Sequence, residues 1–515
     1  MKRFASLVSL FVLAGFPSFA APTASGAIVI DDDFTTGPHG WEAFFVDHPP
    51  GVEAGWGLEA GLRPLPPELE RAGTGFMITG NNHSDDLGMA LKKSIGPDDG
   101  LTPGQTYWID YEIEFASNAP NGAPGVGGSP GDSVYVKAGA SVAEPRAVLN
   151  QEENHLRPSV NVGFQSQGGP AATVVGVIAN GRDATDPAQF VALTREHRHG
   201  FPVRADAGGR LWLLVMTDSA FEGPTTLHYL RIRATLTPIE LGGGAGLINL
   251  STRGRVFPGD DLMVAGFVVR GTGAGRHVIR AIGPTLAEYE VPDVLPDPRV
   301  EVVGSLGESL GSNDDWSASD KVEALRQAMA TVGAFPLPDG SRDAAVLVDI
   351  AEGVHSALMR GAGGAAGTGL VEVYAVPSPE RSVRLVNLST RARVGQGANA
   401  IVAGFVLAGS KPERLLLRAA GPALTEHGIA NPSADPILTL YRGQEVIATN
   451  PAWEYVNAGD EVAAAALAVG AFPFAAGSRD AALLVTLEPG LYTMMVEDAD
   501  PASTRTALVE VYSVP

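Results

Sequence analysis

Clusters of acidic side chains are the part of this sequence best suited to chemistry. Asp31-Asp32-Asp33 stands at the entry to the first strand pattern, and Asp218 and Glu222 flank a later turn. Oxygen-rich loops of this kind suit calcium, which takes about six to eight oxygen ligands with loose geometry. We therefore predict a structural calcium ion held by Asp31, Asp32, Asp33, Asp218 and Glu222. The alternative is ordinary turn chemistry, in which Asp side chains cap their own backbone.

Tryptophans and a polar loop in the same half of the chain are suited to binding a sugar. Trp41 and Trp56 lie in loop-like sequence, and Trp108 alternates with acidic residues on the outer face of a strand. Aromatic rings offer an apolar face on which a sugar ring can stack. A polar loop between two strand patterns adds side chains that hydrogen bond to hydroxyl groups. The predicted ligand-binding residues are Trp41, Trp56, Trp108, Asn82, Asp85 and Asp86.

Two other patterns resemble reactive sites but do not support one. Ser129 lies in a Gly-x-Ser-x-Gly pattern, but a hydrolase elbow needs a strand before the serine and a helix after it. Here the serine lies in a loop rich in Gly and Pro, with Pro130 directly after it. His197 and His199 would share one face of a strand and could ligate a metal. A third ligand is not evident nearby, so we predict no catalytic residue.

The C-terminal half of the chain consists of two copies of one sequence module. Asn249-Leu250-Ser251-Thr252-Arg253 returns 138 residues later, at positions 387–391. Gly340-Ser341-Arg342-Asp343 returns 137 residues later, at positions 477–480. Trp316 and Trp453 also recur, and we expect them to be core anchors. Two copies of one module favour a multivalent or spacing architecture over a single catalytic centre.

Hydrophobic alternation with a period of two predicts a mainly β protein. Tyr107, Ile109, Tyr111, Ile113 and Phe115 alternate with polar or acidic residues, as a half-buried strand does. We expect an N-terminal jelly-roll-like β-sandwich at 28–238, followed by two small β-sandwich modules at 247–376 and 383–515. Each module should carry one short helix, and in copy one Ser319 is a plausible N-cap.

Composition excludes several classes of partner. The net charge is −22, whereas nucleic-acid binding needs a basic footprint, so no nucleic acid is expected. The first 20 residues read as a secretory signal peptide cleaved near Ala20, which predicts a secreted or cell-envelope protein with no membrane span in its mature form. The chain has no cysteine, which excludes disulfides and thiolate metal sites.

The recurring motifs resemble a repeat of large secreted proteins of environmental bacteria. The motifs are Asn-Leu-Ser-Thr-Arg, Ala-Gly-Phe-Val, Arg-Ala-x-Gly-Pro, Gly-Ala-Phe, Gly-Ser-x-Asp-Ala-Ala and Val-Glu-Val-Tyr. This resemblance implies location and architecture but no activity. Copy one departs from the pattern by carrying Glu352-Gly353-Val354-His355 where copy two has Pro489-Gly490-Leu491-Tyr492.

The N-terminal unit is more loosely similar to jelly-roll carbohydrate-binding modules. The likeness rests on Asp33-Phe34, on Gly40-Trp41, on Tyr107 opening a strand after Pro-Gly-Gln-Thr, and on the strand end at Leu236. It implies a glycan ligand and often a structural calcium ion. Our first hypothesis is a secreted, non-enzymatic binding or adhesion protein with a glycan or cell-surface ligand on the N-terminal unit. The alternatives are an extracellular polysaccharide hydrolase and a purely structural surface or matrix protein.

Overall fold

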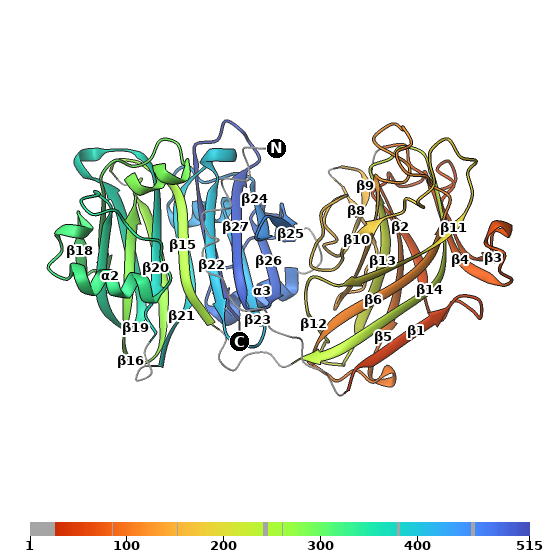
Figure 1. The fold of residues 1–515 in the computed structure, drawn as a ribbon, viewed down its shortest axis with the longest axis horizontal. Coiled ribbons are helices and arrows are strands. Elements are labelled where there is room, and N and C mark those ends of the chain that lie inside the picture. The colour runs from red at the N-terminus through yellow and green to blue at the C-terminus, as the bar shows by residue number, and fades with distance from the viewer. Residues whose placement is uncertain are drawn as a thin grey trace.

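The computed structural model describes residues 26–84, 86–151, 153–239, 246–259, 261–377, 382–454 and 459–514. The predicted signal peptide, Asp85, residues 241–245 of the glycine-rich linker and residues 378–380 of the second joint lie outside the described residues. Two lobes lie side by side along the long axis, with the N-terminal lobe on the right of Figure 1. None of the helices in the described part of the chain has the length and apolar character needed to cross a bilayer.

The N-terminal lobe is a sandwich of two antiparallel sheets, as the mainly β prediction requires. The seven strands of the first sheet are β11 (Val191–Arg198), β6 (Thr106–Ser117), β14 (Pro224–Ile239), β4 (Thr74–Asn81), β3 (Glu59–Pro64), β1 (Ile28–Asp33) and β12 (Val203–Arg204). The five strands of the second sheet are β10 (Thr173–Val177), β7 (Val134–Ser141), β13 (Leu211–Ser219), β5 (Leu87–Ile95) and β2 (Glu42–Val46). A hairpin of β8 (Ala147–Asn150) and β9 (His155–Pro158) stands apart from both sheets.

Strand β6 shows why this lobe folds as a sandwich. Its alternate residues from Tyr107 to Phe115 are buried in the core between the sheets, whereas Trp108 and the three acidic residues that follow at alternate positions are partly exposed. Successive side chains of a strand point to opposite faces, so one face can be apolar and the other polar. The predicted period of two is confirmed here.

The C-terminal lobe is one large sheet system that contains strands from both repeat copies. The strands of copy one are β15 (Gly246–Val256), β16 (Met263–Ile282), β17 (Pro298–Val303), β18 (Ser309–Asn313), β19 (Ala344–Gly361) and β20 (Gly367–Ala375). The strands of copy two are β21 (Ser382–Val394), β22 (Ile401–Ala408), β23 (Glu413–Ala420), β24 (Pro436–Arg442), β25 (Glu445–Asn450), β26 (Ala481–Leu487), β27 (Gly490–Asp498) and β28 (Arg505–Ser513).

The two copies exchange their first strands. Strand β15 of copy one pairs with β20 of its own copy and with β22 of copy two. Strand β21 of copy two pairs with β28 of its own copy and with β16 of copy one. Each first strand therefore completes a sheet to which the other copy contributes, and its edge is not left exposed.

The expectation that each copy is a self-contained sandwich is therefore corrected. A single apolar core runs through the lobe and joins Phe267 and Met359 of copy one to Phe405 and Val511 of copy two. An isolated copy would lose one pairing edge of its first strand and about half of this core. Burial of apolar area is the main favourable contribution to folding, so the shared core favours the joined arrangement.

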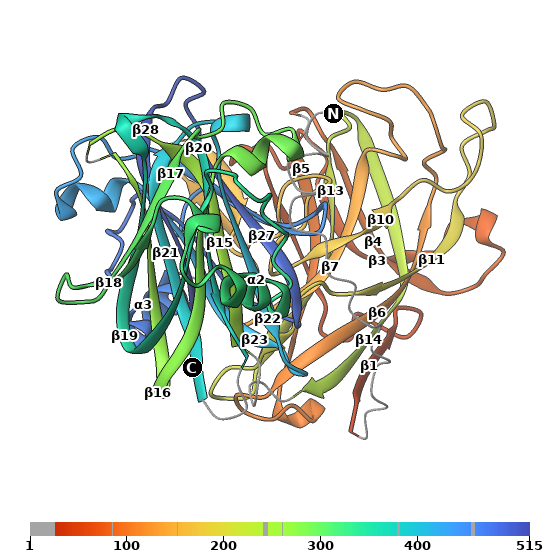
Figure 2. The ribbon, with the colours of Figure 1, turned by 60° about the vertical axis from the view of Figure 1, so that its left-hand side comes forward.

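Each copy nevertheless keeps a smaller core under its own helix. Helix α2 (Val322–Thr331) packs Leu325 and Met329 beside Trp316, and helix α3 (Gly459–Val469) packs Val462 beside Trp453. In Figure 2, α2 lies in front of the strands. Both tryptophans are buried, which confirms their prediction as core anchors. Ser319 is not the N-cap that was predicted: the helix begins at Val322 and its N-cap position is Lys321, which makes no side-chain cap bond. The Ser319 hydroxyl instead accepts the backbone N–H of Lys321 in the preceding turn.

Candidate ligand-binding site

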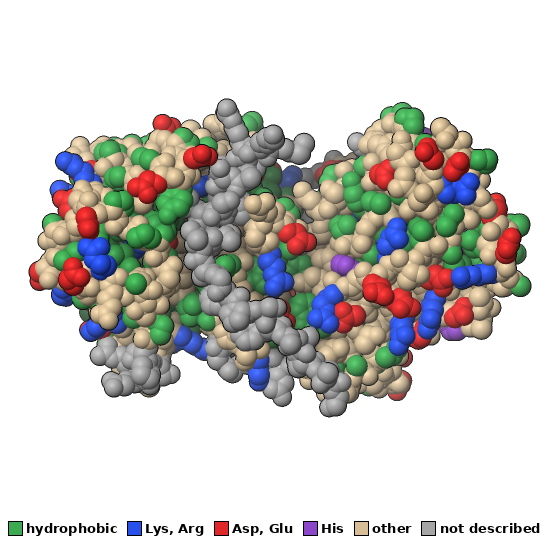
Figure 3. Space-filling model, viewed as in Figure 1, with side chains coloured by type: hydrophobic (Ala, Val, Ile, Leu, Met, Phe, Trp, Pro, Cys, Tyr) green, Lys and Arg blue, Asp and Glu red, His purple; other side chains and the backbone are tan. Residues whose placement is uncertain are grey.

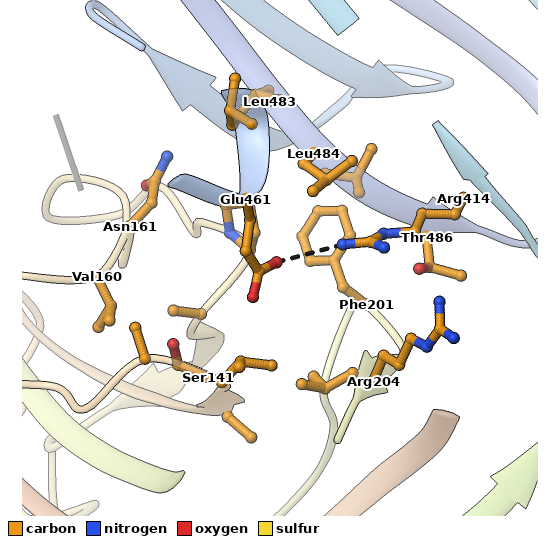
Figure 4. Close-up of a pocket in the computed structure, with 18 of the residues that line it drawn as sticks. Ser141, Val160, Asn161, Phe201, Arg204, Arg414, Glu461, Leu483, Leu484 and Thr486 are labelled. Carbon is orange, nitrogen blue, oxygen red and sulfur yellow. Dashed lines mark hydrogen bonds and ion pairs between the residues drawn. The ribbon is translucent and has the colours of Figure 1, made fainter. Parts of the chain in front are cut away.

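A crevice of about 550 Å³ lies between the two lobes, a volume within the range of small-ligand sites. The N-terminal lobe lines it with the end of β7, with residues 160–161 and with the segment 201–207 that contains β12. Copy two lines the opposite wall with β26, with α3 and with Arg414 at the start of β23. Figure 4 shows side chains of both lobes facing this space.

Two arginines and one glutamate give the crevice its charge. The Arg414 Nη2 atom lies 3.2 Å from the Glu461 Oε2 atom, and Arg204 approaches from the N-terminal lobe. Burial lowers the pKa of Arg414; the Glu461 carboxylate opposes this effect and the neighbouring Arg204 adds to it. The Arg204 Nε atom donates to the carbonyl of Gly104 at 3.0 Å, which holds this guanidinium on its wall. Two like charges therefore lie near each other, and the partly exposed Glu461 carboxylate is paired with Arg414.

Aromatic and amide groups make up the remainder of the wall. Phe201 and Trp453 line the crevice, and the Trp453 Nε1 atom is fixed by donation to the Ala475 carbonyl at 3.2 Å. Asn450 also lines it, and its buried Oδ1 atom has no hydrogen-bond partner among the described residues. In copy one the equivalent Asn313 Oδ1 atom accepts the backbone N–H of Ala345 at 3.0 Å. The amide oxygen of Asn450 in copy two is therefore buried without a partner, whereas the amide oxygen of Asn313 in copy one has one.

A second hollow of about 1120 Å³ continues from the first. Gly104, Arg204 and Arg414 line both hollows. The second hollow adds Arg270 and Arg384, together with Glu413, whose pKa is raised by burial. The junction between the lobes therefore carries four arginines along one continuous space.

The structure does not expose the tryptophans that were predicted to stack on a sugar. Trp41 is 3% exposed and donates to the Asp32 carboxylate at 2.9 Å, and Trp56 is 9% exposed. Both belong to the sandwich core, where their large apolar rings are removed from water. Trp108 is half-buried, and its Nε1 atom donates to Glu488 of the other lobe at 2.8 Å. These three residues are structural, and Trp108 holds the lobes together.

The polar residues of the predicted ligand set are also engaged in structural contacts. The buried Asn82 side chain donates to the carbonyls of Ser219 and Phe221, which ties its loop to the end of β13. Asp86 accepts from Arg157 at 2.8 Å, and Arg157 also binds Asp47 at 2.8 Å. Burial and neighbouring carboxylates raise the pKa of Asp47 well above its usual range, although Arg157 opposes this effect.

The predicted calcium ligands do not meet in one place. Asp31 and Asp32 point to opposite faces of β1, where Arg231 lies 2.5 Å from Asp31 and Lys93 lies 2.6 Å from Asp32. Asp33 accepts the backbone N–H of Thr35 in a turn. In the residues that the structure describes, no group of three or more His, Asp or Glu side chains is arranged to hold a metal ion. A calcium site therefore stays a prediction that these pairings do not support.

Asp218 and Glu222 likewise make separate structural contacts and do not form a shared site. The Asp218 carboxylate is buried 2.8 Å from the Lys137 ammonium, which itself is fully buried. The backbone N–H of Glu222 donates to the Val126 carbonyl, which positions the loop that contains Ser129. Ser129 donates to Asp132 at 3.0 Å within that loop, so the hydrolase-like pattern forms no strand-to-helix elbow.

His197 and His199 share a face of the chain, as predicted. The Nε2 atom of His197 lies 2.7 Å from the Thr173 hydroxyl, and the Nδ1 atom of His199 lies 3.1 Å from it. Burial lowers the pKa of His199 to about 3 and also lowers the pKa of His197. The pair forms a buried hydrogen-bond network with Thr173, which fixes β10 against β11.

Buried ion pairs account for the repeated motifs. In copy one, the Arg280 Nη2 atom lies 2.5 Å from the Glu372 Oε2 atom, and the guanidinium stacks 4.3 Å from the centre of the Phe335 ring. Arg418 and Glu510 form the same pair in copy two, at 3.3 Å. The Arg-Ala-x-Gly-Pro, Gly-Ala-Phe and Val-Glu-Val-Tyr motifs therefore supply one cation, its aromatic platform and its carboxylate.

Sequence reasoning missed Arg204, Arg414 and Glu461. Arg414 has a counterpart in copy one, Arg276, and Glu461 replaces Ala324 of the first helix. This local difference between the copies is the one signal that the sequence offers. Nothing in the sequence places Arg204 beside either residue, because that neighbourhood depends on how the lobes dock.

Comparisons with known proteins give no family for the chain. No protein-family model matches it, and no curated protein matches it. Among solved structures, it is similar to the Sulfolobus turreted icosahedral virus structure at 13% identity, over 58% of this chain and 90% of that chain, with a TM-score of 0.17. It is also similar to the tandem CBM51 modules of a family 98 glycoside hydrolase from Streptococcus pneumoniae at 8% identity, over 95% of this chain and 100% of that chain, with a TM-score of 0.17. Similarities at this level carry no argument about function.

Proposed function

We propose that this chain is a secreted or cell-envelope binding protein whose ligand is a saccharide held in the crevice between the lobes. The observation that carries the proposal is the composition of the crevice wall. It combines apolar surface from both lobes with the polar side chains of Arg204, Arg414 and Asn450. The rings of Phe201 and Trp453 are only 2% and 7% exposed, so they act mainly as core residues beneath this wall.

A sugar matches this combination of groups. Its ring carbons present apolar patches to an apolar wall, and its hydroxyl groups donate and accept hydrogen bonds. A buried acceptor without a partner costs free energy unless a water or a ligand supplies a donor. A ligand hydroxyl group that reaches the Asn450 Oδ1 atom would supply the donor that this acceptor lacks.

Binding is favoured over hydrolysis by the state of the carboxylates. Asp206 and Glu461 are the two carboxylates that line the crevice in the described part of the chain. Asp206 accepts the backbone N–H groups of Gly208 and Arg210, and Glu461 is paired with Arg414. A glycosidase needs one carboxylic acid that can donate a proton and one free carboxylate. Neither group is arranged for the first role, and Glu413 of the second hollow, whose pKa burial raises, accepts from the Ser513 hydroxyl.

The C-terminal lobe would serve to display this site outside the cell. Its strand-exchanged sheets contribute one wall of the crevice, and the two lobes contact each other through Trp108 and Glu488. Secretion is tested by expressing the full chain in a bacterial host and sequencing the N-terminus of the exported protein. We expect the exported chain to begin near Ala21.

The binding proposal is tested by closing the crevice from an exposed helix position. Ala464 lies on α3, is exposed and lines the crevice, so Ala464→Trp fills the space with little change to the core. The matched control is Gln327→Trp, an exposed position on α2 that occupies the same place in copy one. A glycan array on the full chain identifies a binding saccharide, and calorimetry then measures each variant.

We expect Ala464→Trp to weaken binding about tenfold or more, equivalent to about 1.4 kcal/mol, and Gln327→Trp to leave it unchanged. Equal affinities in the two variants would refute the proposal. The absence of binding to every saccharide would favour the structural alternative. Release of reducing ends that Glu461→Gln abolishes would favour the hydrolase instead.

A further inference from the structure

Resting on the proposed function, we infer that the saccharide is acidic and that its carboxylate groups bind to Arg204 and Arg414. This assignment names the ligand class of the crevice and explains why cationic side chains gather at the junction of the lobes. The ligand it points to is a chain of uronic-acid units, because acidic groups would then recur along the two connected hollows.

The distribution of charge is the first observation. The chain has a net charge of −22, and Figure 3 shows acidic and basic side chains interspersed over the face in view, with no continuous basic field. Arg204, Arg270, Arg384 and Arg414 nevertheless line the two connected hollows at the junction, where they outnumber the carboxylates of Asp206, Glu413 and Glu461. An anionic ligand that the surface as a whole repels would find its favourable potential there, because clefts focus the field of the charges that line them.

The second observation is that Arg204 and Arg414 lie close enough for their charges to repel, while the carboxylate paired with Arg414 is well exposed. Glu461 pairs with Arg414 at 3.2 Å, but 46% of its side chain is exposed to solvent, so water weakens the pair. Arg204 adds a like charge whose field disfavours the charged form of Arg414. A carboxylate placed between the two guanidinium groups would relieve this repulsion.

The geometry of guanidinium groups favours a carboxylate as the bridging anion. A guanidinium presents parallel N–H donors that match the two oxygens of a carboxylate, and such charge-assisted hydrogen bonds are stronger than neutral ones. The Nε atom of Arg204 donates to the Gly104 carbonyl, and the terminal nitrogens carry the remaining N–H donors of the guanidinium.

The continuation of the crevice argues for a polymer over a single sugar. Arg204 and Arg414 line both hollows, and Arg270 and Arg384 line the second. Arg270 has Glu352 at 3.3 Å, but both side chains are more than half exposed, so this pair is easily exchanged for a ligand carboxylate. An oligosaccharide with an acid on each unit would contact several of these arginines in turn.

The test uses the full chain with three probes: an oligogalacturonate, a neutral oligosaccharide of the same length and a sulfated oligosaccharide. The variants are Arg204→Gln and Arg414→Gln, and the matched control is Arg276→Gln. Arg276 is the copy-one counterpart of Arg414, is half-exposed and pairs with Asp349 at 3.5 Å, away from the crevice. Thermal melting confirms that each variant is folded, and Arg414→Lys tests whether charge without the planar fork is sufficient.

We expect the oligogalacturonate to bind tightest. Arg204→Gln and Arg414→Gln should each weaken it about tenfold or more, Arg414→Lys should restore only part of the loss, and Arg276→Gln should have no effect. Binding should also weaken as sodium chloride rises from about 0.05 M to about 0.5 M, because salt screens charge–charge attraction.

Three contrary outcomes are distinguishable. If the neutral probe binds equally well, loses affinity in Ala464→Trp and ignores the arginine variants, the ligand is a neutral sugar and this inference is wrong while the proposed function stands. If the sulfated probe alone binds, the carboxylate assignment is wrong. If Ala464→Trp changes the binding of none of the probes, the proposed function itself fails.

Discussion

Thr252 and Thr390 occupy the same position in the two repeat copies, and their hydroxyl groups hydrogen bond to each other at 2.8 Å in the centre of the C-terminal lobe. Both side chains are fully buried. A residue that contacts its own counterpart lies on a two-fold axis. The C-terminal lobe is therefore built as a two-fold dimer of modules within one chain, with β15 and β21 side by side at its axis.

This relationship predicts the behaviour of a single copy. Residues 246–377 expressed alone should associate as a homodimer, because a second copy can supply the strand edge and the core that copy two supplies in the chain. Size-exclusion chromatography with light scattering should give twice the mass of one copy, and residues 246–514 should be monomeric. A folded monomer of one copy would contradict the shared core.

The buried ion pair of each copy should be sensitive to the loss of one partner. Arg280→Met would leave the Glu372 carboxylate buried without its cation, and we expect a loss of about 3–5 kcal/mol in the free energy of unfolding. The double variant Arg280→Met/Glu372→Leu should lose less, since no buried charge then remains. Urea unfolding measures the free energy of unfolding of both variants. A loss in the double variant that equals or exceeds the loss in Arg280→Met would contradict this explanation.

His199 should make stability fall in mild acid. Its pKa is about 3 in the folded chain and near 6.5 when unfolded, because burial opposes the charged imidazole. The unfolded state binds the proton first, so this contribution is fully present above about pH 6.5 and is lost as the pH falls toward 3. The slope within that window is about 1.4 kcal/mol per pH unit.

His199→Gln should flatten this dependence. Urea midpoints measured between about pH 7.5 and pH 5 stay above the range in which most carboxylates titrate. The difference in unfolding free energy between the original chain and the variant at each pH gives the contribution of His199. If the stability of both proteins depends on pH in the same way, His199 is not buried in its neutral form.

Calcium should add little to the stability of the N-terminal lobe. Asp31, Asp32 and Asp218 are already neutralised by Arg231, Lys93 and Lys137, so an ion at these carboxylates would have to displace a cationic side chain. We expect the Tm in about 5 mM calcium chloride to stay within about 1 °C of the Tm in EDTA. A larger rise that Asp218→Asn removes would restore the predicted site.

Local patterns in the sequence predicted the elements better than the site. The alternation of β6, the two helices and the burial of Trp316 and Trp453 follow from periodicities of two and about 3.6 residues, and all were predicted. Trp41 and Trp56 were misplaced because a loop-like sequence says nothing about what folds over it. Asn82 and Asp86 were correctly expected to be polar loop residues, but their partners lie far away in the chain.

The sequence by itself determined the mainly β content, the duplication and the residues that recur in both copies, because these depend on spacing along one chain. Tertiary structure decided that the copies share strands and a core, and that Arg204 faces Arg414 across the junction of the lobes. Both outcomes depend on contacts between segments more than a hundred residues apart. Such contacts form where they bury the most apolar area and pair the most charges in the folded chain. A local sequence pattern specifies neither the buried area nor the charge pairing.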